Sequence, residues 1–187
     1  FVINLFFLML NFYQPVDYIG LILNPIIFLA LLAFIFFDLP QAGTMVEKNL
    51  YIHIMFSLSS YGLLFLAGTQ AIILKYQINS IKNIHHSTLL NSFPSIEQMG
   101  EIMHRLIISG FIILTLSLLS GIPYTTTDIG YDIKQKIIFS LIAWITYLYI
   151  LFKKSYFGIN DVTAANMTIG GLLFLLFAYL GTKLLIG

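Results

Sequence analysis

The stretch NLYIHIMFSLSSYGLLFLAGTQAIILKY, residues 49–76, decides the fold. From Asn49 to Leu74 it contains no aspartate, glutamate, lysine or arginine. An α-helix rises about 1.5 Å per residue, so about 20 apolar residues cross the hydrocarbon core of a bilayer. A strand of a membrane β-barrel needs only about 10 residues of alternating polarity. Length and pattern therefore predict a transmembrane helix over 49–76.

The whole chain shares this character. Of 187 residues, 59% are hydrophobic and 9% are charged, and the mean hydropathy is +0.93. Soluble domains are roughly a quarter charged, so we expect the lipid bilayer to be the main partner. A net charge of +1 does not indicate nucleic-acid binding. The absence of cysteine excludes disulfides and cysteine-bound iron–sulfur clusters.

Polar residues divide the chain into six apolar segments. The fold class is therefore predicted to be all-α, one polytopic transmembrane helical bundle over residues 1–187. Ser95 to Gln98 resembles a helix-capping box, Asn160 and Asp161 are good N-cap residues, and Pro25 predicts a kink. The first segment is short and starts at Phe1 without a methionine, so we expect further spans upstream. The predicted spans are 1–13, 18–37, 49–76, 95–122, 133–152 and 160–185.

Basic residues give a weak indication of orientation. Alternating spans put five on one side and four on the other. The first group lies immediately at helix ends, so we expect its side to be cytoplasmic. The five are Lys75, Lys82, Arg105, Lys153 and Lys154, and the four are Lys48, Lys134, Lys136 and Lys183.

Two of the predicted helices carry a stripe of small residues. Such stripes allow helices to pack closely in a membrane, and they also leave room for a flat apolar ligand. Both interpretations stay open. The stripes are His53, Ser57, Ser60, Leu64, Ala67 and Ala71 in the third helix, and Ala164, Thr168, Gly171, Ala178 and Thr182 in the last.

Histidines are the first candidates for chemistry. His53 lies near one end of its predicted helix, and an ionisable residue at a membrane boundary indicates function. Histidine is a common ligand of haem iron; the alternative is a histidine bonded to a loop carbonyl. His104 lies on the opposite side of a core about 30 Å thick, so it cannot share an iron with His53. The adjacent His85 and His86 have no carboxylate or cysteine nearby and do not predict a metal site.

Three further side chains are candidates. Arg105 can pair with Glu101 four residues before it, anchor a lipid headgroup or reach a propionate. Lys136 can extend to the membrane surface or meet an anionic ligand. Trp144 falls in mid-span, where its indole N–H needs a partner, so we expect it to face protein.

Four motifs carry a resemblance to a known family. They are His53-Ile-Met-Phe-Ser-Leu-Ser-Ser-Tyr61; Glu101-Ile-Met-His-Arg105 with Gly110-Phe111, Leu114-Thr115-Leu116 and Gly121; Lys136 with Ala143-Trp144 and Tyr147; and Gly170 with Ala178-Tyr179 and Gly181. In order and spacing these resemble the cytochrome c assembly family, the CcsA/CcmC-type haem-handling superfamily, and specifically its HemX/YpjD-like branch. The resemblance covers about residues 20–187.

The resemblance implies a cofactor and a location. It implies about eight spans in the full-length protein, a bacterial-type inner membrane, and the His53 side outside. It also implies haem b, with His53 as axial ligand of the haem iron. Tyr61, Arg105, Lys136 and Trp144 are then the further cofactor-binding candidates.

Departures from the family pattern separate the possible functions. The tryptophan-rich WGxxWxWD segment of the haem lyases is replaced by GIPYTTTD at residues 121–128, and no histidine follows His104. Haem lyase activity is therefore disfavoured. We expect an accessory protein of cytochrome c assembly or haem biogenesis that holds or senses haem. The alternative is a non-haem scaffold or regulator that binds a membrane protein partner.

Overall fold

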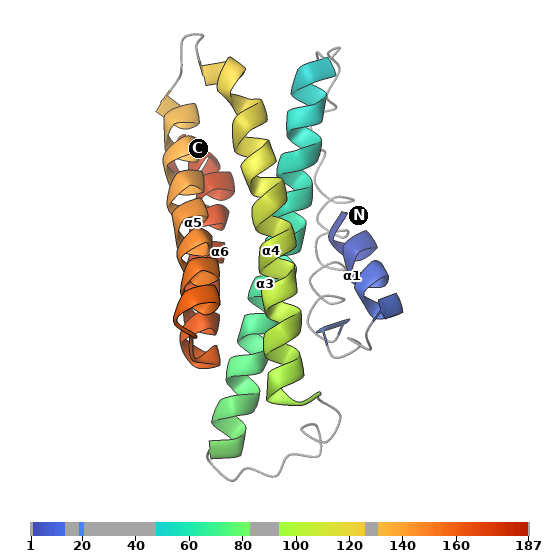
Figure 1. Cartoon of the computed structure of the whole chain (residues 1–187). Helices are drawn as coiled ribbons and strands as arrows, with labels where there is room; N and C mark the ends of the chain where they lie inside the picture. The colour runs from blue at the N-terminus through green and yellow to red at the C-terminus, as the bar shows by residue number, and fades with distance from the viewer. Residues whose placement is uncertain (1, 14–18, 21–47, 83–93, 126–130, 187) are drawn as a thin grey trace.

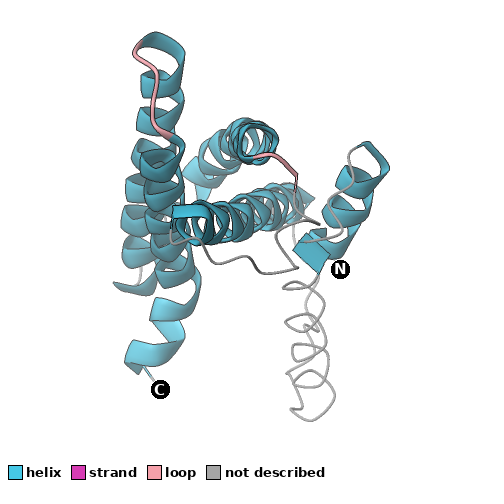
Figure 2. Cartoon of the chain, turned by 90° about the horizontal axis from the view of Figure 1, so that it is seen from below, coloured by secondary structure: helices cyan, strands magenta, loops and turns pink. Residues whose placement is uncertain are grey.

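The computed structural model describes residues 2–13, 19–20, 48–82, 94–125 and 131–186. Every regular element in these residues is a helix (Figure 2). The helices are α1 (Val2–Tyr13), α3 (Lys48–Lys82), α4 (Ile96–Gly121), the short 3-10 helix η2 (Ile122–Thr125), α5 (Tyr131–Tyr156) and α6 (Asp161–Ile186).

Four of these helices, α3 to α6, are long and apolar enough to cross a membrane. This confirms the predicted class, a helical membrane bundle. The sequence predicts six spans, whereas the described residues contain four. With 12 residues, α1 is about 18 Å long, which is less than the hydrocarbon thickness. The predicted span at 18–37, with its kink at Pro25, lies outside the described residues apart from 19–20.

Two helices run further than predicted. The segment from Gln77 to Lys82, which lies beyond the predicted span 49–76, is the last part of α3. It contains no proline or glycine to end the helix. The positive charge of Lys82 in the last turn interacts favourably with the negative, C-terminal end of the helix dipole. The Gln77 side-chain amide also donates to the carbonyl of Pro94 at 3.0 Å, which joins the end of α3 to the start of α4. Similarly, α5 continues to Tyr156, with Lys153 and Lys154 in its last turn.

The predicted helix starts are confirmed. The Ser95 hydroxyl accepts from the backbone N–H of Gln98, and the Gln98 side chain accepts from the backbone N–H of Ser95, both at 3.3 Å. This is the capping box. At α6, the Asn160 side-chain oxygen accepts from the N–H of Val162 at 2.9 Å. Both devices satisfy N–H groups that the first turn of a helix leaves unpaired.

The helices pack as two antiparallel pairs (Figure 1). Helix α3 packs against α4 and α5 packs against α6, while α3 also contacts α6 and α1. At one end lie the start of α3, the end of α4 and the start of α5, and we call this the His53 end. The opposite end, where α4 and α6 begin, is the Arg105 end.

The predicted stripes of small residues are packing seams along most of their length. On α3, Ser60, Leu64, Ala67 and Ala71 are each 0% exposed. On α6, Ala164, Thr168, Gly171 and Ala178 are buried, and the Thr182 side chain lies outside the described part. Opposite the α3 seam, a Cβ atom on Gly110 would lie 2.6 Å from a methyl carbon of Leu64. Glycine therefore lets the backbones of α3 and α4 approach closely.

Candidate functional site

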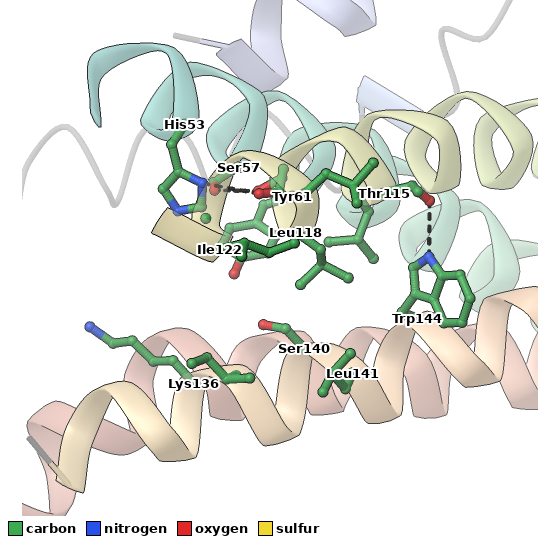
Figure 3. Close-up of a pocket in the computed structure, with 15 residues that line it drawn as sticks. His53, Ser57, Tyr61, Thr115, Leu118, Ile122, Lys136, Ser140, Leu141 and Trp144 are labelled. Atoms are coloured by element: carbon green, nitrogen blue, oxygen red, sulfur yellow. Dashed lines mark hydrogen bonds between the residues drawn. The ribbon is translucent and has the colours of Figure 1, made fainter. Parts of the chain in front are cut away.

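A cavity of about 540 Å³ lies between α4 and α5, with the first turns of α3 as its third wall (Figure 3). Most of its lining is apolar. The lining residues are His53, Ser57 and Tyr61 of α3; Leu114, Thr115, Ser117, Leu118, Leu119 and Gly121 of α4; Ile122 of η2; and Lys136, Ile137, Ser140, Leu141 and Trp144 of α5.

Four of the five residues predicted as cofactor-binding line this one cavity: His53, Tyr61, Lys136 and Trp144. They come from two helices that are separated in the sequence. In Figure 3, His53 and Lys136 lie on opposite walls near one end of the cavity, and Trp144 lies towards the other end. The arrangement combines an imidazole, an ammonium group and apolar walls.

The orientation of the His53 ring is set by α4. Its Nδ1 lies 3.0 Å from the carbonyl oxygen of Ser117 and 3.1 Å from the hydroxyl oxygen of Ser120. A carbonyl can only accept, so Nδ1 carries the proton and Nε2 is the basic nitrogen of the ring. The sequence offers a hydrogen bond from His53 to a loop carbonyl as an alternative to haem ligation. The structure contains such a bond, but the carbonyl belongs to Ser117 of helix α4.

Gly121 makes room for this ring. A Cβ atom on Gly121 would lie 2.9 Å from Cε1 and 3.4 Å from Nδ1 of His53. Carbon atoms do not approach so closely, so any larger residue would push the imidazole aside. The glycine at the end of α4 therefore belongs to the site because the imidazole packs directly on it.

Hydroxyl groups tie the α3 and α4 walls together below His53. The hydroxyl oxygens of Ser57 and Ser117 are 2.6 Å apart. The Ser60 hydroxyl donates to the carbonyl of Ser57, and that of Ser120 to the carbonyl of Ser117, both at 2.9 Å. These bonds satisfy polar groups that would be costly to leave unpaired in a membrane.

Trp144 forms the deep end of the cavity. Its indole N–H donates to the Thr115 hydroxyl at 2.9 Å, and its ring stacks on Phe111 with centroids 5.4 Å apart. Thr115 in turn donates to the carbonyl of Phe111 at 2.8 Å. The expectation that Trp144 faces protein is confirmed, and this contact bridges α4 and α5.

Ser117, Ser140 and Gly121 also line the cavity, although the sequence alone does not assign them to a site. Ser117 and Ser140 are buried, at 4% and 7% exposure. The available signal was spacing: Ser117 and Gly121 are four residues apart, so they lie on one face of α4. That face meets the His53 face of α3, which the sequence of either helix alone does not show.

Arg105 and His104 lie away from this cavity. They are near the start of α4, and His104 is 17 residues from Gly121, or about 26 Å along a helix. Arg105 pairs with Glu101 at 3.3 Å on the exposed surface, which is one of the three roles that the sequence leaves open for it. The Nδ1 atom of His104 is buried and has no hydrogen-bond partner among the residues that the structure describes. His85 and His86 lie outside the described residues.

The donor set differs from that of a site for a free metal ion. Within the described ranges, no three histidine, cysteine, aspartate or glutamate side chains come together to hold a metal. Protein sites for free transition-metal ions commonly supply at least three ligands. A single imidazole beside an apolar cavity instead suits a metal that already carries most of its ligands.

Comparison with known proteins places the chain in a family. The inner membrane protein YpjD of Escherichia coli K12 is 25% identical over 136 residues, which are 73% of this chain and 51% of that protein. Its counterparts in strains O6:H1 and O157:H7 match equally. The chain thus spans about half the length of these relatives. No solved structure gives a significant match. The family model described as cytochrome C assembly protein matches residues 1–187, and the chain therefore belongs to the cytochrome c assembly protein family.

Proposed function

We propose that this membrane protein holds or senses haem b at its His53 end, as an accessory protein of cytochrome c assembly or haem biogenesis. The observation that carries the proposal is the imidazole of His53, whose Nδ1–H is bonded to the Ser117 carbonyl at 3.0 Å beside an apolar cavity. Iron-bound histidines commonly donate their other ring N–H in this way, which fixes the tautomer and raises the basicity of the ligand nitrogen.

The cavity suits haem in size and polarity. Its volume of about 540 Å³ lies within the roughly 300–1,000 Å³ of small-molecule sites. Apolar walls suit a porphyrin, and a lone histidine is a sufficient protein ligand for haem iron. When bound, haem supplies a redox-active iron, while the residues of this chain bind and orient it.

Lys136 is the candidate partner of the haem propionates. It lines the cavity and is exposed. It lies two residues after the start of the candidate span Lys134–Tyr156. A lysine at this depth can extend its ammonium group to the membrane surface. There it would meet carboxylates that remain near water while the apolar ring lies deeper.

A small excess of basic residues at the Arg105 end supports the placement of the His53 end outside, and the similarity to an inner membrane protein of Escherichia coli supports a bacterial-type inner membrane. By their helix positions, Lys75, Lys82, Arg105, Lys153 and Lys154 lie towards the Arg105 end, and Lys48, Lys134, Lys136 and Lys183 lie towards the His53 end, five against four. Cytoplasmic segments carry the excess of lysine and arginine. The Arg105 end is therefore the cytoplasmic one in this proposal.

The test is the absorption spectrum of the purified protein, as isolated and after addition of haem, beside that of His53→Ala. We expect a Soret band that weakens or shifts in the variant. His104→Ala is the matched control, because it removes a histidine about 26 Å away along α4, and its spectrum should equal that of the unchanged protein.

One observation favours a second function, that of a non-haem scaffold or regulator binding a membrane protein partner. The described part of the cavity lining offers only one imidazole, as expected of a family member that has lost haem binding. A preparation without haem that cannot be reconstituted would favour this function, as would a Soret band indifferent to His53→Ala.

A further inference from the structure

The lining of the cavity divides into buried and exposed side chains. Leu114 and Ser117 are 1% and 4% exposed, so they form the closed back. In contrast, Leu119 of α4 is 58% exposed and Leu141 of α5 is 43% exposed, although both line the same cavity. A side chain that borders a cavity and also lies on the outer surface marks its opening. Ile122 of η2 also lines the cavity, at the His53 end, and is 57% exposed. We call the part of the lining that Leu119 and Leu141 border the mouth.

The mouth lies at membrane depth. Leu119 is within the candidate span Ile96–Gly121, and Leu141 is seven residues after the start of the span at Lys134, about 10 Å along a helix. The surface beside the mouth is apolar, with Leu116, Ile138 and Ile145 at 43%, 56% and 59% exposure. An apolar surface at this depth lies in the hydrocarbon layer of a bilayer, so the mouth opens into that layer rather than into water.

The deep end of the mouth is closed and the other end carries a charge. The hydrogen bond from Trp144 to Thr115 joins α4 to α5 below the cavity. Lys136 lines the cavity one turn nearer the membrane surface than Ser140. A molecule in the mouth would therefore have its apolar body among leucines and an anionic group beside the lysine.

We propose that the cavity takes up its ligand sideways from the bilayer, through the mouth between Leu119 and Leu141. The proposal rests on the proposed function, in which the ligand is haem. It defines the ligand class further as a flat amphipathic molecule already dissolved in the lipid leaflet at the His53 end. The apolar ring of the ligand then does not need to pass through water.

The test uses Trp144, the only tryptophan in this sequence, as a reporter of cavity filling. Proteoliposomes are mixed with phosphatidylcholine vesicles that contain haem, or iron-free protoporphyrin IX, and quenching of Trp144 fluorescence is followed in time. The doubly substituted Leu119→Phe/Leu141→Phe narrows the mouth. We expect it to fill about tenfold more slowly than the unchanged protein, which corresponds to ~1.4 kcal/mol of added barrier.

Two variants make the result specific. Leu116→Phe/Ile145→Phe adds the same bulk to exposed positions of α4 and α5 that do not line the cavity, and it should fill at the unchanged rate. Leu119→Ala/Leu141→Ala widens the mouth and should fill faster, so the proposal stays testable if the narrowed variant does not fold. Equal rates in the narrowed, widened and control variants would overturn lateral uptake.

The two proposals fail in different ways. Protoporphyrin IX has no iron and needs no axial ligand, so it tests the mouth even if His53 does not bind haem. Quenching that depends on the mouth, with a Soret band indifferent to His53→Ala, would retain lateral uptake and reject haem ligation. A Soret band that depends on His53, with filling rates that do not depend on the mouth, would retain haem ligation and reject lateral uptake.

Discussion

The two sides of α4 meet their neighbours in different ways. Towards α3, glycine and serine lie opposite leucine and alanine, and the helices pack closely. Leu64, Ala67 and Ala71 are fully buried in this seam. Towards α5, larger side chains hold the helices apart, and the described contact is centred on Trp144, Phe111 and Thr115. Between this bridge and the His53 end lies the cavity.

The difference teaches how a membrane bundle keeps a site open. Close helix packing through small residues is the main attraction between helices in lipid. The α3–α4 seam uses it, and this rigid pair positions His53 against Ser117. The α4–α5 pair lacks such packing near the His53 end, where the cavity lies.

Gly110→Leu should damage the α3–α4 seam most. A Cβ atom there would lie 2.6 Å from a Leu64 methyl carbon and 2.7 Å from its Cγ, and Leu64 has no exposed surface. Overpacking costs ~1–3 kcal/mol or more, so we expect a clear drop in the midpoint of thermal unfolding in detergent. Ser109→Leu, at the adjacent exposed position, should be nearly neutral. Equal effects at 109 and 110 would show that the seam is not tightly packed.

Gly121→Ala should weaken haem binding without unfolding the protein. The new methyl group would lie 2.9 Å from Cε1 of His53 and would displace the imidazole. Loss of correct ligand orientation typically costs 10- to 100-fold in affinity, so we expect a decrease of at least about tenfold. A haem titration followed at the Soret band measures it. Gly170→Ala is the control, since no atom lies within 4 Å of its added Cβ; similar affinities in both variants would argue against a role for the His53 orientation.

The bridge between α4 and α5 should show a small, specific coupling. In a double-mutant cycle, Trp144→Phe and Thr115→Val remove the two sides of the 2.9 Å hydrogen bond. Hydrogen bonds between membrane helices average ~0.6 kcal/mol in such cycles, and we expect a coupling of this size in unfolding free energy. Thr146→Val in place of Thr115→Val is the control, because the Thr146 hydroxyl donates to Ile142 within α5. That cycle should give no coupling.

Arg105→Gln should have the smallest effect. The side chains of Arg105 and Glu101 are 65% and 62% exposed, and exposed pairs of this spacing contribute only ~0.3–0.5 kcal/mol. Because Arg105 does not line the cavity, haem affinity in the Soret titration should not change. A marked loss would mean that Arg105 takes part in binding. Lys136→Gln is the informative counterpart, since that lysine does line the cavity and its loss should weaken binding of an anionic ligand.

Some features could be predicted from the sequence because they depend on local physics. Uncharged runs such as 49–74 predict membrane helices, and the capping residues Ser95 and Asn160 mark helix starts that the structure confirms. The need of the Trp144 indole N–H for a partner follows from its position in mid-span. Glu101 and Arg105 can pair because one helical turn separates them.

Other features depend on how helices meet, which periodicity does not encode. The sequence suggests His53 as a candidate but not that the Ser117 carbonyl and Gly121 receive its ring. It also suggests Arg105 as a propionate partner, whereas the structure separates that residue from the cavity because α4 runs away from the His53 end. The helix predicted to end at residue 76 continues to Lys82, because no proline or glycine in residues 77–82 ends it.

The proton on the His53 ring is located by a main-chain oxygen, that of Ser117. Every amino acid supplies such an oxygen, so no replacement of the side chain at position 117 deletes the acceptor. Only a shift of the helix itself would remove it. A substitution at position 117 therefore leaves this acceptor in place as long as α4 keeps its position against α3.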